Sequence, residues 1–247
     1  MGETPTMDAG KLIIAISSCW RYEQCGWNNA LRDTWLRDAH DLGITHRFFH
    51  GRGEKPQSDI VVTDSYADYH SLMYKTLEKF KWVLANGYDS VFHCYHDTYA
   101  CAERLRLPEG VDYFGDFYHE DPRQPWPHLS YGKFCQSGAG VLLSRKALQV
   151  AVGGMVARLK TNPSYWEEDV CTGESILNAP ELTVKDSRDM PCNLTQHDHG
   201  PRRSNNMISC HLSTIQPDGH WNGQGRETEW KYRPEFMYKL HREWQTS

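Results

Sequence analysis

The alternation of short apolar runs with helix-forming segments is the feature of this sequence that most restricts its fold. Residues 12–16 and 90–94 are short and apolar, as strands buried in a sheet are. Between them, residues 69–85 carry apolar side chains at three- and four-residue spacing, which predicts an amphipathic helix that Gly87 ends. Strands and helices that alternate in this way are typical of an α/β domain with a largely parallel sheet.

The rest of the chain continues this pattern. Helices are predicted for residues 28–41 and 145–159, with Ser144 as the N-cap of the second, and residues 100–105 are also compatible with a helix. Further strands are predicted at residues 45–50, 60–62, 109–115, 141–143 and 207–212, and another helix near residues 171–177. Because the 247 residues contain no internal repeat and no linker, we expect one domain.

Composition argues against several classes of protein. A net charge of −5 disfavours nucleic-acid binding, which usually goes with a basic excess. No apolar run approaches the ~20 residues that span a bilayer, so we expect no stable membrane insertion of this chain. The eight cysteines form no C-x-x-C pair, which disfavours a structural zinc ribbon and leaves their pairing open.

Polar residues gather where predicted strands end or helices begin. Tyr95-His96-Asp97 follows an apolar run, at the position where α/β proteins hold phosphate ligands and their metal ions. Glu167-Glu168-Asp169 and Cys210-His211 are two further clusters. Each cluster also has an interpretation without a functional site. The histidines near residue 96 could be surface residues, residues 167–169 could be a solvated helix start, and His211 could be a hydrogen-bonded core residue.

Five motifs stand in order along the chain. They are N-A-L-R-D-T-W at 29–35, D-S-Y at 64–66 with S-L-M-Y-K-T at 71–76, Y-H-D at 95–97, K-F-C-Q-S-G-A-G-V-L-L-S at 133–144, and E-D-V-C-T-G at 168–173. In content and order they resemble the motifs of inverting, nucleotide-sugar-dependent glycosyltransferases of the β1,3-galactosyltransferase, β1,3-N-acetylglucosaminyltransferase and Fringe family. The order of the five together is far more specific than any one of them.

The resemblance implies an α/β fold of GT-A type, with a Rossmann-like nucleotide-binding half and a mixed central sheet flanked by helices. Residues 11–100 would bind the nucleotide sugar, residues 101–220 would form the acceptor and catalytic half, and residues 221–247 would be a tail packed on the body. The implied reaction is metal-dependent, inverting transfer of a sugar from a UDP-sugar to a hydroxyl of a glycan or glycoprotein acceptor, which forms a β-linkage.

The resemblance also implies roles for single residues. Asp169 stands where the family has the base that removes the proton of the acceptor hydroxyl. Asp97, His211 and His96 are the expected ligands of Mn²⁺ or Mg²⁺, which offsets charge on the departing diphosphate. The expected donor-binding residues are Ser17, Ser18, Arg32, Lys75, Tyr95, Gly138 and Ala139, and the expected acceptor-binding residues are Trp166 and Glu168.

Departures from the family pattern keep other functions open. Tyr95 and His96 replace the first two aspartates of the D-D-D metal motif, as in a weakened metal site or an inactive member that binds carbohydrate. A metallohydrolase built on His93, His96, Asp97 and residues 197–199 is a third possibility. The chain also lacks a cysteine that family members commonly carry, and it shows no membrane anchor. We therefore expect a soluble cytoplasmic enzyme, or alternatively a catalytic domain cut from an enzyme anchored in the Golgi.

Overall fold

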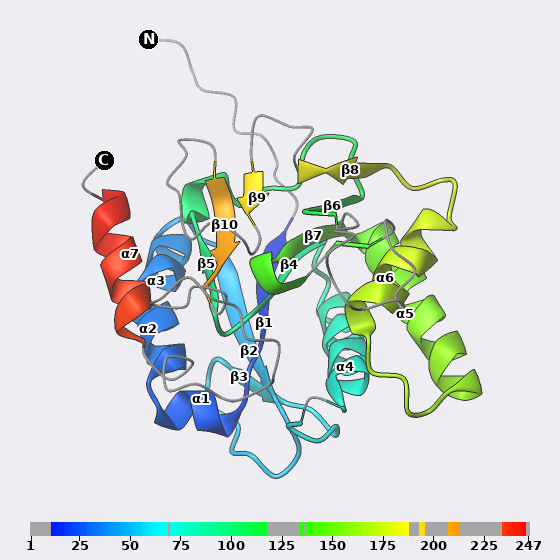
Figure 1. The fold of residues 1–247 in the computed structure, drawn as a ribbon, viewed down its shortest axis with the longest axis horizontal. Coiled ribbons are helices and arrows are strands. Elements are labelled where there is room, and N and C mark those ends of the chain that lie inside the picture. The colour runs from blue at the N-terminus through cyan, green and yellow to red at the C-terminus, as the bar shows by residue number, and fades with distance from the viewer. Residues whose placement is uncertain are drawn as a thin grey trace, which may run out of the picture.

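The computed structural model describes residues 11–68, 70–117, 134–135, 137–187, 193–195, 207–212 and 234–245. A seven-stranded sheet runs through this part of the molecule in the order β3-β2-β1-β4-β7-β6-β8 (Figure 1). Its strands are β1 (Leu12–Ser17), β2 (Thr45–His50), β3 (Ile60–Val62), β4 (Ser90–Tyr95), β6 (Tyr113–Gly115), β7 (Val141–Ser144) and β8 (Val184–Asp186). A second sheet has the order β5-β10-β9, from Thr98–Ala100, Met207–His211 and Asn193–Thr195.

The large sheet is mixed, as predicted. β1 pairs in parallel with β2 and β4, and β2 pairs in parallel with β3. β7 runs antiparallel to β4 and β6, whereas β6 and β8 are parallel. Strands from both predicted halves of the chain, 11–100 and 101–220, share this sheet, and the boundary between the halves stays a prediction.

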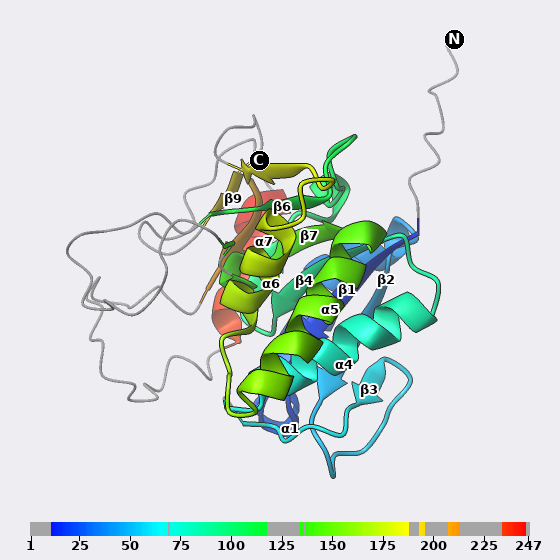
Figure 2. The same cartoon turned by 90° about the vertical axis from the view of Figure 1, so that its right-hand side faces the viewer.

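Helices cover both faces of the sheet. Figure 1 shows α2 (Trp27–Asp33) and α3 (Trp35–Asp41) on one side, after the short α1 (Trp20–Gln24), with α7 (Glu235–Gln245) outside them. Figure 2 shows α4 (Leu72–Ala85), α5 (Arg145–Thr161) and α6 (Glu168–Leu177) on the other side. Side chains of β1 alternate between the two cores. Ile14 and Ile16 pack with the α2 and α3 side, and Ile13 and Ala15 pack with the α4 and α5 side.

The predicted end of α4 and the predicted start of α5 are both confirmed. Gly87 follows α4 with a φ of 71°, a left-handed conformation that glycine adopts without strain and that ends the helix. Ser144 is the N-cap of α5, and its hydroxyl accepts a hydrogen bond from the Ala147 amide at 3.2 Å.

The single helix predicted at residues 28–41 is wrong, because the chain forms α2 and α3 with a break at Thr34. This residue has φ −117° and ψ −119°, and its hydroxyl donates to the Ala30 carbonyl at 2.5 Å. A threonine hydroxyl that bonds to the preceding turn competes with the backbone pattern of the helix. The same side chain therefore explains the break.

Two other predicted boundaries also differ. Residues 100–105 do not form an α-helix, since β5 is followed by the 3-10 turn η1 (Ala102–Arg104). The strand predicted at 109–115 begins only at β6, because a turn precedes it. In that turn the Val111 amide donates to the Pro108 carbonyl at 3.1 Å and Gly110 has a φ of 69°.

Helix α7, in the described part of residues 221–247, packs against α2. The Tyr238 hydroxyl of α7 donates to Asp33 Oδ2 of α2 at 2.7 Å, and Met237 is buried. Among the described helices none is both long and apolar enough to cross a membrane. The seven cysteines in the described part of the chain form no disulfide with one another.

Candidate active site

The C-terminal ends of β1, β2 and β4 lie side by side at one edge of the large sheet. Ser17 is in register with Phe49 of β2 and Tyr95 of β4. The Ser18 amide donates to the Phe49 carbonyl at 3.1 Å, and the His96 amide donates to the Ser17 carbonyl at 3.2 Å. Ligands of α/β sheets bind outside the C-terminal ends of parallel strands. Four predicted site residues, Ser17, Ser18, Tyr95 and His96, therefore meet where a ligand is expected.

Helix α4 brings two lysines to this edge. Lys75 is buried, and its Nζ donates to the Ser18 carbonyl at 3.1 Å. One turn later, Lys79 is 0% exposed; its Nζ donates to Ser17 Oγ at 2.6 Å and lies 2.7 Å from His93 Nδ1. Burial lowers the pKa of both amines, to about 7 for Lys79.

The imidazole of His93 lies between Lys79 and the start of α6. Its Nε2 is 4.0 Å from Glu168 Oε1 and has no hydrogen-bond partner in the part of the chain that the structure describes. Glu168 is buried and accepts a hydrogen bond from the Tyr95 hydroxyl. Burial raises the pKa of Glu168, although the Tyr95 hydrogen bond and the charge of Lys79 oppose the rise. A buried polar cluster thus connects β1, α4, β4 and α6.

Asp169, the predicted base, is the second residue of α6 and is half-buried. Its Oδ1 accepts a hydrogen bond from the Val170 amide at 2.8 Å. Burial raises the pKa of Asp169 well above its ordinary range, and the adjacent charge of Glu168 raises it further. The interpretation of this acidic run as a solvated helix start is wrong for Glu168, which is 3% exposed. Trp166 is half-buried in the loop before the helix.

The turn that carries Asp97 joins the two sheets. Asp97 is buried, and its carbonyl accepts a hydrogen bond from the Leu212 amide at 2.8 Å. Next to this contact, β10 pairs with β5 so that His211 stands opposite Thr98. Directly opposed Cα atoms of antiparallel strands are about 4.5–5.5 Å apart, so the backbones of the two predicted ligands are neighbours. The side chain of His211 lies outside the described part of the structure.

The small residues before β7 are held at the same place by hydrogen bonds from both strands of this pair. They belong to the 3-10 turn η2 (Ser137–Ala139). The Thr98 hydroxyl donates to the Gly138 carbonyl at 2.9 Å, and the Ser209 hydroxyl donates to the Ala139 carbonyl. Two further predicted donor-binding residues thereby lie next to the turn of Asp97.

The imidazole of His96 is turned toward aromatic side chains. It stacks on Tyr22 with ring centroids 3.4 Å apart and meets Trp27 edge-on at 6.1 Å. Within the described ranges, no group of three or more His, Cys, Asp or Glu residues is placed to hold a metal ion.

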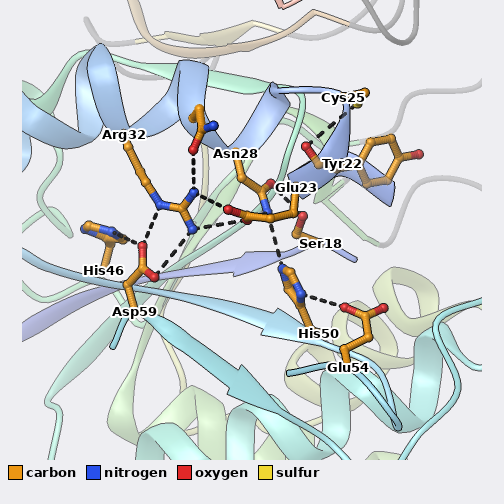
Figure 3. Close-up of polar contacts among 11 residues, drawn as sticks. Ser18, Tyr22, Glu23, Cys25, Asn28, Arg32, His46, His50, Glu54 and Asp59 are labelled. Carbon is orange, nitrogen blue, oxygen red and sulfur yellow. Dashed lines mark hydrogen bonds and ion pairs between the residues drawn. The ribbon is translucent and has the colours of Figure 1, made fainter. Parts of the chain in front are cut away.

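Arg32 lies in a separate polar network (Figure 3). Its guanidinium bridges Glu23 at 2.6 Å and Asp59 at 2.7 Å, and it also donates to Asn29 Oδ1 at 2.8 Å. Burial tends to raise the pKa of Asp59, but hydrogen bonds from His46 and Arg32 outweigh it and hold this pKa well below its ordinary range. The contacts of Arg32 that the structure describes are thus structural.

This network reaches the sheet edge through Asn28. The Asn28 amide donates to Glu23 at 2.7 Å, and its carbonyl oxygen accepts from the Ser18 hydroxyl at 2.7 Å. Asn28 Nδ2 also lies 3.2 Å from His50 Nε2, and His50 Nδ1 lies 2.6 Å from Glu54 (Figure 3). Hydrogen bonds thus connect Arg32 to Ser18, in the loop that leaves β1, through Glu23 and Asn28.

Comparison with known proteins finds a similar fold but no relative in sequence. No protein-family model matches the chain, and no curated protein matches it in sequence. Among solved structures, the chain matches the crystal structure of a glycosyltransferase involved in the glycosylation of the major capsid of PBCV-1. The match has a TM-score of 0.56 at 11% identity and covers 92% of this chain and 98% of the other. The fold is a glycosyltransferase fold of GT-A type.

Within this glycosyltransferase fold, the predicted site residues separate into two groups. Those at the ends of β1 and β4, on η2, and on the Asp97 turn share one edge, whereas Arg32 lies in the network behind it. Sequence reasoning missed the buried role of Lys79. The available signal was its spacing, because a residue four positions after Lys75 falls on the same face of the helix.

Proposed function

We propose that this protein is a metal-dependent, inverting glycosyltransferase of the β1,3-galactosyltransferase, β1,3-N-acetylglucosaminyltransferase and Fringe kind. It would move a sugar from a UDP-sugar to a hydroxyl of a glycan or glycoprotein acceptor and form a β-linkage. One observation carries the proposal. The Tyr95 hydroxyl at the end of β4 bonds to Glu168, and this contact brings Asp169, the next residue, to the edge where the donor would bind.

Asp169 has the chemistry that the base of such a reaction needs. The acceptor oxygen attacks the anomeric carbon of the donor, the bond to the diphosphate breaks with its electron pair, and the hydroxyl proton passes to the Asp169 carboxylate. A base works best when its pKa approaches the working pH. Burial and the charge of Glu168 both raise the pKa of Asp169 in that direction.

Donor binding is proposed for the residues gathered at the sheet edge. Lys75, whose amine reaches the Ser18 carbonyl at 3.1 Å, would attract the diphosphate. Asp97 and His211 would hold Mn²⁺ or Mg²⁺, which supplies electrostatic stabilisation of the leaving diphosphate when bound. The other proposed donor-binding residues are Ser17, Ser18, Tyr95, Gly138 and Ala139. Trp166 is proposed to contact the acceptor, while the burial of Glu168 suits it to hold the site together.

A second function, carbohydrate binding without catalysis, is favoured by the two altered positions of the metal motif. The Tyr95 hydroxyl is bonded to Glu168, and the His96 ring is stacked on Tyr22. Both side chains thus make contacts within the protein where the family has aspartates. A protein of this kind would bind a sugar or nucleotide sugar and release no UDP.

Measurement of UDP release separates the two functions. The protein is incubated with Mn²⁺ and each of a panel of UDP-sugars, with and without acceptor glycans, and compared with Asp169→Asn and with an EDTA-treated sample. We expect donor-specific UDP release that EDTA abolishes and that Asp169→Asn lowers by about 10²–10⁴-fold without loss of donor binding. Binding without any UDP release would favour the carbohydrate-binding function. Full turnover by Asp169→Asn would overturn the role of this residue.

A further inference from the structure

Lys79 is a buried amine in the interior below the proposed active site, and it is protonated below its pKa of about 7. Lysine is almost never fully buried unless it is paired. Here Nζ bonds to Ser17 Oγ at 2.6 Å and to His93 Nδ1 at 2.7 Å, so α4 is tied to two strands. The charged groups that act on it are Glu168 of α6, which favours the ammonium, and Lys75 of its own helix, which opposes it; the Cys94 thiol of β4 also faces it.

The ammonium sets the tautomer of His93. A protonated lysine can only donate, so Nδ1 must accept, and the proton of the neutral imidazole then sits on Nε2. Burial lowers the pKa of His93 well below its ordinary value and the charge of Lys79 lowers it further. Together they outweigh a hydrogen bond with the Ala15 backbone that raises this pKa, so the ring is neutral. The Nε2–H points toward Glu168 Oε1, 4.0 Å away. Within the described residues Nε2 has no hydrogen-bond partner, and a small shift of either side chain would close this gap.

Glu168 is thus bonded from one side and faced by the Lys79–His93 pair from the other. The Tyr95 hydroxyl donates to its Oε1 from the end of β4, and the Lys79–His93 pair faces the same carboxylate from α4 and β4. Its charge matters because Asp169 is the next residue. A negative charge on Glu168 makes Asp169 hold its proton more tightly, as does that of Glu167. The interior cluster therefore acts on the proposed base without touching substrate.

We propose that Lys79 and His93 are positioning residues of the transfer reaction, which hold the Glu168 carboxylate in its charged form and so keep Asp169 a strong base. This inference rests on the proposed function. Without Lys79, the buried Glu168 takes up a proton, its repulsion of the Asp169 charge is lost, and Asp169 becomes a weaker base.

The first test compares the pH dependence of kcat for wild type, Lys79→Met and Lys81→Met. Lys81 is exposed on the same helix and serves as the matched control. In Lys79→Met we expect kcat to fall about tenfold and the acid limb of the profile to move down by about one pH unit, whereas Lys81→Met matches wild type. His93→Leu should move the limb in the same direction, and it takes the place of Lys79→Met if that variant does not fold. Loss of stability alone would lower activity without moving the limb.

The second test needs no variant and no activity. The ¹⁵N shifts of the histidine side chains in the wild-type protein at pH 6 should show His93 neutral and protonated on Nε2. Protonation on Nδ1, or a charged ring, would overturn the inference. An active wild type whose acid limb is unmoved in Lys79→Met and His93→Leu would overturn it as well, while leaving the proposed function intact. A wild type that releases no UDP from any donor would instead count against the proposed function, and the tautomer would still report on the cluster.

Discussion

Gly140 offers a sharp test of how η2 is positioned, because its backbone passes directly over a core ring. It has a φ of 91°, and a Cβ built there would lie 2.2 Å from Cζ of Phe92. In Gly140→Ala, the left-handed conformation costs about 1–2 kcal/mol for a residue with a Cβ. The clash adds about 1–3 kcal/mol, since Phe92 is completely buried and protein cores are close-packed. The expected loss in the free energy of unfolding is therefore roughly 2–5 kcal/mol.

Urea unfolding of Gly140→Ala and a matched control measures the two contributions separately. Gly110 has a φ of 69°, but a Cβ there would meet nothing within 4 Å. Gly110→Ala should therefore lose only the conformational part, about 1–2 kcal/mol, with an unchanged m value. Equal losses in the two variants would refute the reasoning, because the contact with Phe92 would then contribute nothing.

Three further predictions concern charge. Arg32→Ala should lower the free energy of unfolding by about 1–3 kcal/mol, because it removes the charged donor that the carboxylates of Glu23 and Asp59 share. The low pKa of Asp59 stabilises the folded protein above the ordinary aspartate pKa of about 3.9, and this stabilisation is lost as pH falls below that value. Acid unfolding of Arg32→Ala should therefore begin at a higher pH than that of wild type. An unchanged midpoint of acid unfolding would contradict this prediction. The pKa of Lys79 is lowered from 10.5 to about 7 in the folded protein. Between these two pH values the unfolded chain binds more protons than the folded protein. The free energy of unfolding should therefore rise with pH from about 7 to 10.5. Urea titrations at several pH values should show this rise in wild type and a flatter line in Lys79→Met. Finally, Asp97→Ala should weaken Mn²⁺-dependent binding of UDP in calorimetry and leave metal-free binding unchanged, whereas an unaltered Mn²⁺ effect would exclude Asp97 as a ligand.

The elements that the sequence predicted well are those with a local cause. The apolar runs of β1 and β4, the spacing of α4, and the cap at Ser144 depend on residues a few positions apart. The break at Thr34 was missed although its cause is also local, because the apolar spacing of the region continues across it. The conformation at Thr34 depends on whether its hydroxyl or the backbone bonds to the preceding turn of the helix. The spacing of apolar residues carries no information about this competition.

The sequence predicted where the candidate site lies in the fold, but it did not predict which side chains contact each other there. Residues that follow strands are brought to one edge by the parallel order of β1, β2 and β4, which strand–helix alternation predicts. Partners distant in the chain were not predictable in this way. Arg32 donates a hydrogen bond to Asp59, on the segment before β3, and Lys79 of α4 interacts with the charge of Glu168 on α6. The chemical roles of Asp169, Asp97 and His211 stay predictions.

The reversed direction of β7 has a consequence for how this fold can vary. In a wholly parallel sheet, only segments that leave strands reach the ligand edge, and each is followed at once by a helix. Because β7 is antiparallel to β4, with Val141 opposite His93, a segment that enters a strand reaches the same edge. Within that segment the Thr98 and Ser209 hydroxyls hold η2, and Gly140 packs against Phe92, so these positions restrict how its composition can change. Changes at the other described positions of this segment would therefore act on the ligand edge directly, apart from the helix α6 that carries Asp169.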